Sequence, residues 1–273
     1  MKTLKFIKMH GLGNDFVIID RRKKNLKINE SIIKKLSDRK TGAGCDQIIT
    51  IDKSSTNLVD AKIKIFNPNG DQAEACGNGT RCVAKILFKN LKKRKIVLKS
   101  AAGKLIAQKN KNGTISVNMG KMKEKWTDIP ISKKIDTRNI PINVEGFTNG
   151  FAVNIGNPHI VFYGTNLNKI NLLKIGPKIE KNNLFPKKTN VEFVQIINPK
   201  KIKMRVWERS AGETLACGSG ACAAVYVGFK KYNLKNECKV ILKKGSILIN
   251  ILDNNEVIMT GPAEISYYGE VDI

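Results

Sequence analysis

Two nearly identical phrases in this sequence carry the residues best suited to acid–base chemistry. ACGNGTRC occupies positions 75–82 and ACGSGAC positions 216–222, which places Cys217 141 positions after Cys76. Each cysteine precedes a Gly-x-Gly turn and a run of residues with helical character. The exposed N–H groups and positive dipole end of a helix start lower the pKa of a thiol, so we expect both sulfurs to be reactive.

The same helix starts predict an anion site beside each sulfur. Glycines let a substrate approach the backbone, and the first N–H groups of a helix bind a carboxylate or a phosphate. If both phrases faced one substrate carboxylate, a thiol would lie on each side of its α-carbon. Inverting a stereocentre needs a base on one face and an acid on the other, with donors that stabilise the developing charge. The repeat therefore indicates inversion by one thiolate and one thiol.

An isolated cysteine is more often a small core residue, and we apply this interpretation to the other four. Cys82 and Cys222 fall inside the helical runs, and we expect Cys45 and Cys238 to be structural as well. Six cysteines would suggest disulfides in a short secreted chain, but this chain is long and lacks a signal-peptide pattern, so we expect thiols. The C-x5-C and C-x4-C spacings differ from the paired C-x2-C of zinc sites, and we expect no metal.

The elements that position the first phrase form a β-rich unit. Strand-like TLKFIKMH and DFVIID flank the turn GLGN and predict a hairpin. Residues 30–36 have helical spacing after Asn29, a candidate cap. Alternating DQIITID and DAKIKIF lead into the phrase, TRCVAKILFKNLKK predicts the principal helix, and KIVLK and GKLIAQK return to a strand pattern.

The second half repeats this plan around the second phrase. FAVNI and HIVFY flank the turn GNP, LLKIGPKIEK predicts a helix, VEFVQII and KMRVW precede the phrase, and a helix and three strand-like runs follow it. Residues 119–150 contain two prolines and no sustained period, which is typical of a connection. We predict an α+β fold of two pseudo-symmetric α/β domains, each a β-sheet or barrel wrapped around a central helix.

Composition favours a globular protein. The chain has 273 residues, 41 % of them apolar, and lacks an uninterrupted apolar run of about 18 residues. We expect a soluble, cytoplasmic protein without a membrane partner.

The net charge of +26, from 49 basic and 23 acidic residues, would suit a nucleic-acid-binding protein. However, only eight of the basic residues are Arg, the lysines are spread along the chain, and 6 % of residues are aromatic. We attribute the charge to solvated lysine-rich faces and expect no nucleic-acid partner. A positive field would still attract a small anionic substrate.

Six motifs, in order, resemble those of diaminopimelate epimerases over nearly the whole chain. They are MHGLGNDF (9–16), DRKTGAGCDQ (38–47), FNPNGDQAEACGNGTRC (66–82), GNPH (156–159), TNVEFVQ (189–195) and ERSAGETLACGSGA (208–221). That family interconverts LL and meso 2,6-diaminopimelate without a cofactor. The resemblance implies the same PLP-independent reaction, in lysine and peptidoglycan precursor synthesis.

The resemblance also implies roles for individual residues. Cys76 and Cys217 are the acid–base pair, and Glu208 and His159 lie beside the thiols and the reacting ammonium. The reacting carboxylate is bound by the residues after each cysteine, which are Gly77, Asn78, Gly218 and Ser219. The rest of the substrate-binding set, with Arg209 on the far carboxylate, comprises Asn14, Gln47, Asn67, Asn157, Asn190, Glu208 and Arg209.

Departures from the family pattern are small. Ser210 stands where the family usually has Gly, which leaves the local turn open but removes no chemical group, and Ala43 and Cys45 vary within their motif. The family implies a homodimer to which Tyr267 contributes. It also implies that the last strand returns to the first domain, which gives domains 1–117 with 263–273, and 118–262. His10 is expected to be structural.

Other interpretations stay open on the residues alone. Asparagine after glycine is usually a turn residue, His159 could be a core histidine, and Glu208 with Arg209 could form a surface ion pair. A proline racemase-like enzyme of the same fold would lack a need for the set around Arg209, so proline against diaminopimelate as substrate separates the two enzymes. A basic nucleic-acid-binding protein would leave both phrases unexplained, and salt-dependent affinity would reveal it.

Overall fold

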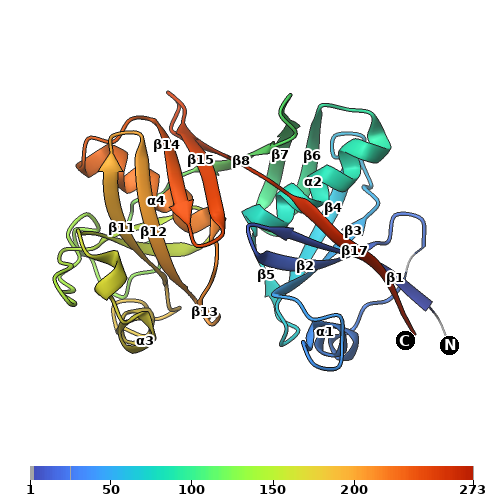
Figure 1. Cartoon of the computed structure of the whole chain (residues 1–273), viewed down its shortest axis with the longest axis horizontal. Helices are drawn as coiled ribbons and strands as arrows, with labels where there is room; N and C mark the ends of the chain where they lie inside the picture. Colours follow the sequence, from blue (N-terminus) through green and yellow to red (C-terminus); the bar gives the residue numbers. More distant parts are fainter. Residues whose placement is uncertain (1–2, 25, 273) are drawn as a thin grey trace. The chain divides into compact units, whose positions relative to one another are not determined.

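The computed structural model describes residues 3–24 and 26–272, and these fall into two units (Figure 1). Unit 1 contains the residues up to Asn118 together with those from Gly261 onward, and unit 2 contains Met119–Thr260. The boundary between the units falls within strand β8 (Ile115–Lys121), which begins in unit 1 and ends in unit 2.

The elements of unit 1 are nine strands and two helices among the described residues. They are β1 (Thr3–Gly11), β2 (Asn14–Asp20), α1 (Glu30–Ser37), β3 (Gln47–Asp52), β4 (Ala61–Phe66), β5 (Gln72–Ala73), α2 (Gly77–Leu91), β6 (Lys95–Ser100), β7 (Gly103–Lys109), β8 (Ile115–Lys121) and β17 (Glu264–Asp272).

Unit 2 follows the same order, with one short 3₁₀ helix added. Its elements are β9 (Phe151–Asn154), β10 (Pro158–Tyr163), η1 (Leu167–Lys169), α3 (Leu172–Glu180), β11 (Asn190–Asn198), β12 (Lys201–Glu208), β13 (Gly212–Glu213), α4 (Gly218–Lys231), β14 (Glu237–Leu242), β15 (Gly245–Ile251) and β16 (Glu256–Gly261).

Strand pairing confirms that the halves are repeats of one plan. In unit 1, β1 pairs antiparallel with β2, β2 parallel with β3, β3 antiparallel with β4, β4 parallel with β6, and β6 antiparallel with β7. In unit 2, the pairs β9–β10, β10–β11, β11–β12, β12–β14 and β14–β15 have the same senses in the same order. The short strands β5 and β13 pair antiparallel with β4 and β12.

Local sequence explains the elements that lead to the first phrase. The predicted β1–β2 hairpin forms, because Leu12 and Gly13 adopt φ of 58° and 87°, the combination that a two-residue turn between twisted strands requires. In β4, Ala61, Ile63 and Ile65 are buried while the lysines between them are exposed, as the alternation predicts. Helix α1 begins at the predicted cap, where the Asn29 side chain accepts a hydrogen bond from Ile32 N.

The helix after each cysteine lies among the strands of its own unit. Helix α2 packs against β1, β2, β6 and β7, and α4 packs against β9, β10, β11, β12, β14 and β15 (Figure 1). Residues from Gly220 to Gly228 of α4 are all buried, since strands surround this helix and leave it no polar face. Each sheet therefore holds the start of its central helix in a fixed place.

The interpretation of residues 119–150 as a connection was wrong. Ile129, Ile131, Ile140 and Ile142 are buried in the apolar core of unit 2, with Phe162 and Phe193. Single bridges, such as Ile140 with Gly150, replace regular strands. The segment is built into the core without a sustained period, which is why its sequence reads as a loop.

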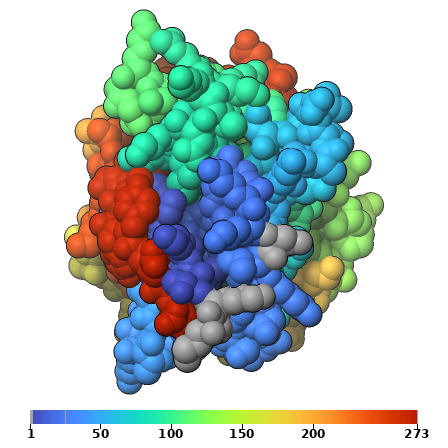
Figure 2. Space-filling model, turned by 90° about the vertical axis from the view of Figure 1, so that its right-hand side faces the viewer, coloured from blue at the N-terminus to red at the C-terminus, as the bar shows by residue number. Residues whose placement is uncertain are grey.

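The last strand, β17, pairs antiparallel with β1 in unit 1, and Figure 2 shows its residues (red) beside those of β1 (dark blue). Its side chains are open to solvent: Tyr267 is 45 % exposed and Tyr268 64 % exposed.

Among the described residues, no helix combines the length and the apolar character that crossing a membrane requires.

Candidate active site

Both cysteines occupy the N-cap position of a central helix, as their place in the sequence predicts. Cys76 has an extended backbone, with φ of −147°, and its Sγ lies 3.4 Å from Gly79 N. Cys217 caps α4 in the same way, with Sγ 3.4 Å from Gly220 N. In each unit a helix N–H therefore points at a sulfur, which is the geometry that stabilises a thiolate.

The first turn of α2 is tied to the β1–β2 hairpin. The Asn78 side chain donates to Asn14 Oδ1 over 3.0 Å, and Asn14 Oδ1 lies 3.9 Å from Cys76 Sγ. Arg81, which is fully buried, donates to Asn78 Oδ1 over 2.9 Å and to the Pro262 carbonyl over 3.1 Å. The guanidinium fixes the orientation of the Asn78 amide, so that its nitrogen faces Asn14.

A charged network holds Asn14 from the other side. Its amide donates to Asp46 Oδ2 over 2.8 Å, and Arg39 bridges Asp46 and Asp15 with two contacts of 2.7 Å. Asp15 also pairs with the buried Lys8, 2.6 Å away. Burial opposes ionisation of Asp15, but the hydrogen bonds from Arg39 and Lys8 outweigh it and lower its pKa to about 2.

The remaining predicted residues of unit 1 form a polar pair at the ends of β3 and β4. Gln47 Nε2 donates to Asn67 Oδ1 over 3.0 Å, and both side chains are half-buried. The structure thus brings Gln47 and Asn67 together, and separately brings Asn14, Cys76 and Asn78 together.

In unit 2, a line of polar side chains leads to Cys217. Its Sγ lies 3.5 Å from Ser219 Oγ, and Asn157 Nδ2 donates to the same oxygen over 3.4 Å. Asn157 Oδ1 lies 2.9 Å from His159 Nε2, and His159 Nδ1 lies 2.7 Å from Glu192 Oε1. His159 and Glu192 are both fully buried.

Glu208 reaches the same sulfur from β12. The Cys217 thiol and the Thr214 hydroxyl both donate to its carboxyl group. Loss of solvent raises the pKa of Glu208, and these two hydrogen bonds oppose the increase.

The expectation of an acidic thiol was wrong for Cys217. Burial, followed by the neighbouring carboxylates of Glu208 and Glu192, raises the pKa of this thiol well above its ordinary value. The hydrogen bonds from Ser219 and from Gly220 N oppose the shift but do not offset it. The helix start is thus the weaker influence on the pKa here, because Cys217 is only 3 % exposed and lies near two acidic side chains.

Asn190 and Arg209 meet at the turn between β12 and β13. Asn190 Oδ1 accepts from Arg209 N over 2.9 Å, and the Arg209 guanidinium donates to the Lys187 carbonyl over 3.4 Å. Ser210 adopts φ of 62°, the left-handed conformation that glycine favours, and its N–H donates to Glu180 Oε1 over 2.9 Å. This bond holds the turn in place despite the missing glycine.

Arg81, Asp46, Glu192 and Thr214 are among the residues of these networks that were not identified from the sequence. These four lie within the six motifs, and Glu192 is a charged residue between Val191 and Phe193, which is the signal that could have revealed it. Cys45, Cys82, Cys222 and Cys238 are buried, as expected of structural residues. His10 lies 3.8 Å from Glu264 at the sheet edge.

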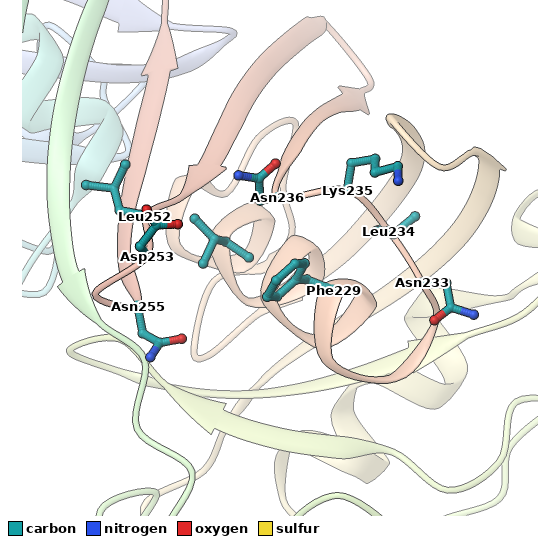
Figure 3. A pocket seen from close by; sticks show the side chains of 9 residues that line it. Phe229, Asn233, Leu234, Lys235, Asn236, Leu252, Asp253 and Asn255 are labelled. Atoms are coloured by element: carbon teal, nitrogen blue, oxygen red, sulfur yellow. The ribbon is translucent and has the colours of Figure 1, made fainter.

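A pocket of about 590 Å³ lies elsewhere in unit 2. Phe229 near the end of α4, Leu234, Asn236, Leu252 and Asn255 are among its lining residues (Figure 3). It contains no predicted site residue and lies toward the end of α4 opposite Cys217. Within the described residues, no group of three or more His, Cys, Asp or Glu side chains is placed to hold a metal ion.

Solved structures of other proteins share the fold of this chain. The chain is similar to a PhzF-family phenazine biosynthesis protein from Enterococcus faecalis, with a TM-score of 0.72 and 14 % identity over all of both chains. It is also similar to a hydroxyproline epimerase from Agrobacterium vitis, with a TM-score of 0.71 and 10 % identity over 98 % of this chain and 92 % of that one.

Sequence similarity identifies the family of this chain. The family model for diaminopimelate epimerase matches residues 6–125 and 151–266. A diaminopimelate epimerase from Carboxydothermus hydrogenoformans is 42 % identical over 98 % of this chain and 99 % of its own length, and one from Pelagibacter ubique is 40 % identical over 95 % of each. This chain belongs to the diaminopimelate epimerase family.

Proposed function

We propose that this protein epimerises LL-2,6-diaminopimelate to the meso form without a cofactor, with Cys76 and Cys217 as the acid–base pair. The observation that carries the proposal is the repeated cap. In both units a cysteine caps the start of a central helix, and its Sγ lies 3.4 Å from the backbone nitrogen three residues later. Two thiols in matched settings suit a reaction that removes a proton from one face of an α-carbon and returns one to the other.

We propose that the two sulfurs nevertheless differ in their resting states. Cys217 rests as the thiol and delivers a proton to the substrate, since burial and two carboxyl groups favour its protonated form. Cys76 is then the thiolate that takes the α-proton. The roles exchange when the reaction runs backwards, because the same path serves both directions.

The residues after each cysteine bind the reacting carboxylate. The N–H groups at the starts of α2 and α4 supply the donors, together with the side chains of Asn78 and Ser219, and stabilise the charge that develops on the carboxylate. The far end of the substrate is held by the polar residues Asn14, Gln47, Asn67, Asn157, Asn190 and Arg209. Arg209 carries the full positive charge for the second carboxylate, and Glu208 and His159 act beside the thiol of Cys217.

The proposal extends to the setting of the enzyme. Each repeat is one domain, with boundaries at 1–117 plus 263–273 and at 118–262. Two copies form a homodimer through the exposed face of β17, where Tyr267 contributes to the contact. The enzyme acts on a small molecule in the cytoplasm, not on nucleic acid, and serves lysine and peptidoglycan precursor synthesis.

A direct assay tests the reaction. The protein is incubated with LL-diaminopimelate and a thiol reductant, and the stereoisomers are separated by chiral chromatography. We expect meso product from the parent chain and from Cys238→Ala, a control that removes a buried cysteine outside both phrases, and none from Cys76→Ala or Cys217→Ala. Turnover of proline in place of diaminopimelate would assign the protein to the proline racemase-like alternative.

A further inference from the structure

Beneath the second cysteine, unit 2 carries a polar pair where unit 1 carries an apolar one. In unit 1, Phe16 on β2 stands opposite Gln47, and Ile49 follows two residues later on β3. In unit 2, His159 on β10 stands opposite Asn190, and Glu192 follows two residues later on β11. Because the strand pairs correspond, His159 replaces Phe16, and Glu192 replaces Ile49, between the two repeats.

Side chains of both pairs lie against the first turn of the helix that the cysteine caps. A Cβ on Gly79 would lie 2.4 Å from Ile49 Cδ1 and 3.3 Å from Phe16 Cε1. A Cβ on Gly220 would lie 2.6 Å from Glu192 Oε1. The glycine is needed in each repeat because the side chain below lies directly against it.

Packing does not explain the polar pair. His159 and Glu192 are fully buried, and Glu192 Oε2 has no hydrogen-bond partner among the described residues. Buried ionisable pairs are often no more stabilising than apolar residues of similar volume. Unit 1 shows that this fold accepts an aromatic and an aliphatic side chain at the same two positions.

The contacts of the pair lead to the sulfur. Nε2 of His159 faces the amide oxygen of Asn157, an acceptor, so this nitrogen carries a hydrogen. The ring is held by Glu192 at Nδ1, where one proton lies between nitrogen and carboxyl oxygen. Asn157 then presents its amide hydrogens to Ser219, which leaves the Ser219 hydroxyl hydrogen available to Cys217 Sγ.

We propose that Glu192 is a positioning residue for the proposed epimerisation: by holding His159 at Nδ1, it directs hydrogen-bond donors through Asn157 and Ser219 toward Sγ of Cys217. The inference rests on the proposed function. Burial and the carboxyl groups of Glu208 and Glu192 disfavour the thiolate of Cys217, whereas the hydrogen bond from Ser219 favours it. The role proposed for Glu192 is therefore to hold the donors in place, against the direct effect of its own charge on the sulfur. The titratable groups that act on this sulfur are Glu208 from β12 and Glu192 from β11, and His159 from β10 acts on Glu208.

The residues of unit 1 supply the test. The double variant His159→Phe with Glu192→Ile places the apolar pair of unit 1 into unit 2, without changing the net charge of the pair. Glu192→Gln keeps the shape of the side chain but removes its charge, so that the ring and its partner hold one proton fewer between them. Glu124→Gln is the matched control, since this carboxyl group of unit 2 pairs with Arg138 and Tyr226 instead.

We expect both Glu192 variants to fold, with kcat lowered at least about tenfold and KM within about threefold of the parent value. The double variant is expected to melt no lower than the parent. Glu124→Gln should keep the parent kcat. Parent-like kcat in Glu192→Gln would overturn the proposal, whether or not the double variant folds.

A second measurement needs no substrate. In a Cys76→Ser background, the rate at which iodoacetamide alkylates Cys217 is followed against pH by peptide mass spectrometry. The double variant removes the held donors, which raises the midpoint, and the carboxylate of Glu192, which lowers it. Because the replaced pair has no net charge when it shares one proton, we expect the loss of the donors to dominate and the midpoint to rise by about one pH unit. An unchanged midpoint would contradict the positioning role. If the parent chain failed to epimerise diaminopimelate, the proposed function would be wrong. The alkylation profile would still test whether Glu192 affects the thiol of Cys217.

Discussion

The side-chain amide of Asn78 donates to Asn14 Oδ1 over 3.0 Å, which joins the first turn of α2 to the β1–β2 hairpin. Asn78 is proposed to bind the reacting carboxylate and Asn14 the far end of the substrate, so one hydrogen bond connects the two parts of the binding set. Arg81 accounts for its direction, because the guanidinium occupies the oxygen of Asn78 and turns the nitrogen toward Asn14.

Asn78→Ala is therefore expected to affect both binding and stability. The variant leaves the buried Arg81 without one acceptor, and an unsatisfied buried charge-assisted bond lowers stability by about 1–3 kcal/mol. We expect kcat/KM for diaminopimelate to fall at least about tenfold and the melting temperature to fall with it. Asn112→Ala, at an exposed turn of unit 1, should change neither. Parent kinetics and stability in Asn78→Ala would contradict a role for the Asn78–Asn14 contact in binding and folding.

The cysteine phrases and the strands that lead to them could be predicted because local patterns determine them. The alternation in β4 and the cap at Asn29 are visible in the sequence, and so is each helix start after a cysteine. The pairing of His159 with Glu192 was not visible, since it joins positions 33 residues apart through the parallel pairing of β10 with β11. Side-chain patterns constrain which face a strand presents but leave its partner open.

The error over the acidity of Cys217 has the same origin. A helix start is a local feature and can be read from the sequence, whereas the acids that oppose it come from β11 and β12. The core role of residues 119–150 was missed for a related reason, because irregular segments can bury isoleucines without a period.

Substitutions of Thr214 distinguish the effect of its hydrogen bond to Glu208 from the effect of its packing. Loss of solvent raises the pKa of Glu208, and the Thr214 hydroxyl opposes that increase, so Thr214→Val should raise this pKa further. We expect the acidic limb of the kcat/KM profile to move to higher pH in the valine variant. Thr214→Ser keeps the hydroxyl and should restore the parent profile. If the serine and valine variants gave the same profile, the hydroxyl would have no part in it.

Asp15 gives a prediction about acid stability. Its folded pKa of about 2 lies below the unfolded value, so its pairing stabilises the fold above about pH 4, and this contribution disappears as the pH falls toward 2. Asp15→Asn should lower the free energy of unfolding by about 1–2 kcal/mol at pH 7, after allowance for solvent screening. Urea unfolding at pH 7 and at pH 2.5 measures the difference, with exposed Asp253→Asn as control. A deficit that was equal at both pH values would contradict the ion-pair account.

Arg209→Lys tests the far carboxylate. Lysine keeps the charge but loses the planar fork of donors, so we expect kcat/KM for diaminopimelate to fall at least about tenfold. Arg94→Lys, an exposed position in unit 1, is the matched control and should match the parent. Unchanged kinetics in Arg209→Lys would remove this residue from the substrate site.

Hydrogen exchange at the inverted carbon tests the two-cysteine mechanism most directly. LL-diaminopimelate is converted in D2O to low conversion, and the product and the recovered substrate are separated and measured by mass spectrometry. If Cys76 takes the α-proton while Cys217 delivers a different one, early meso product carries deuterium at the inverted centre and recovered LL substrate remains largely protonated. Frequent retention of the original proton in the product, or early deuterium in the recovered substrate, would instead indicate a single base that takes and returns the proton.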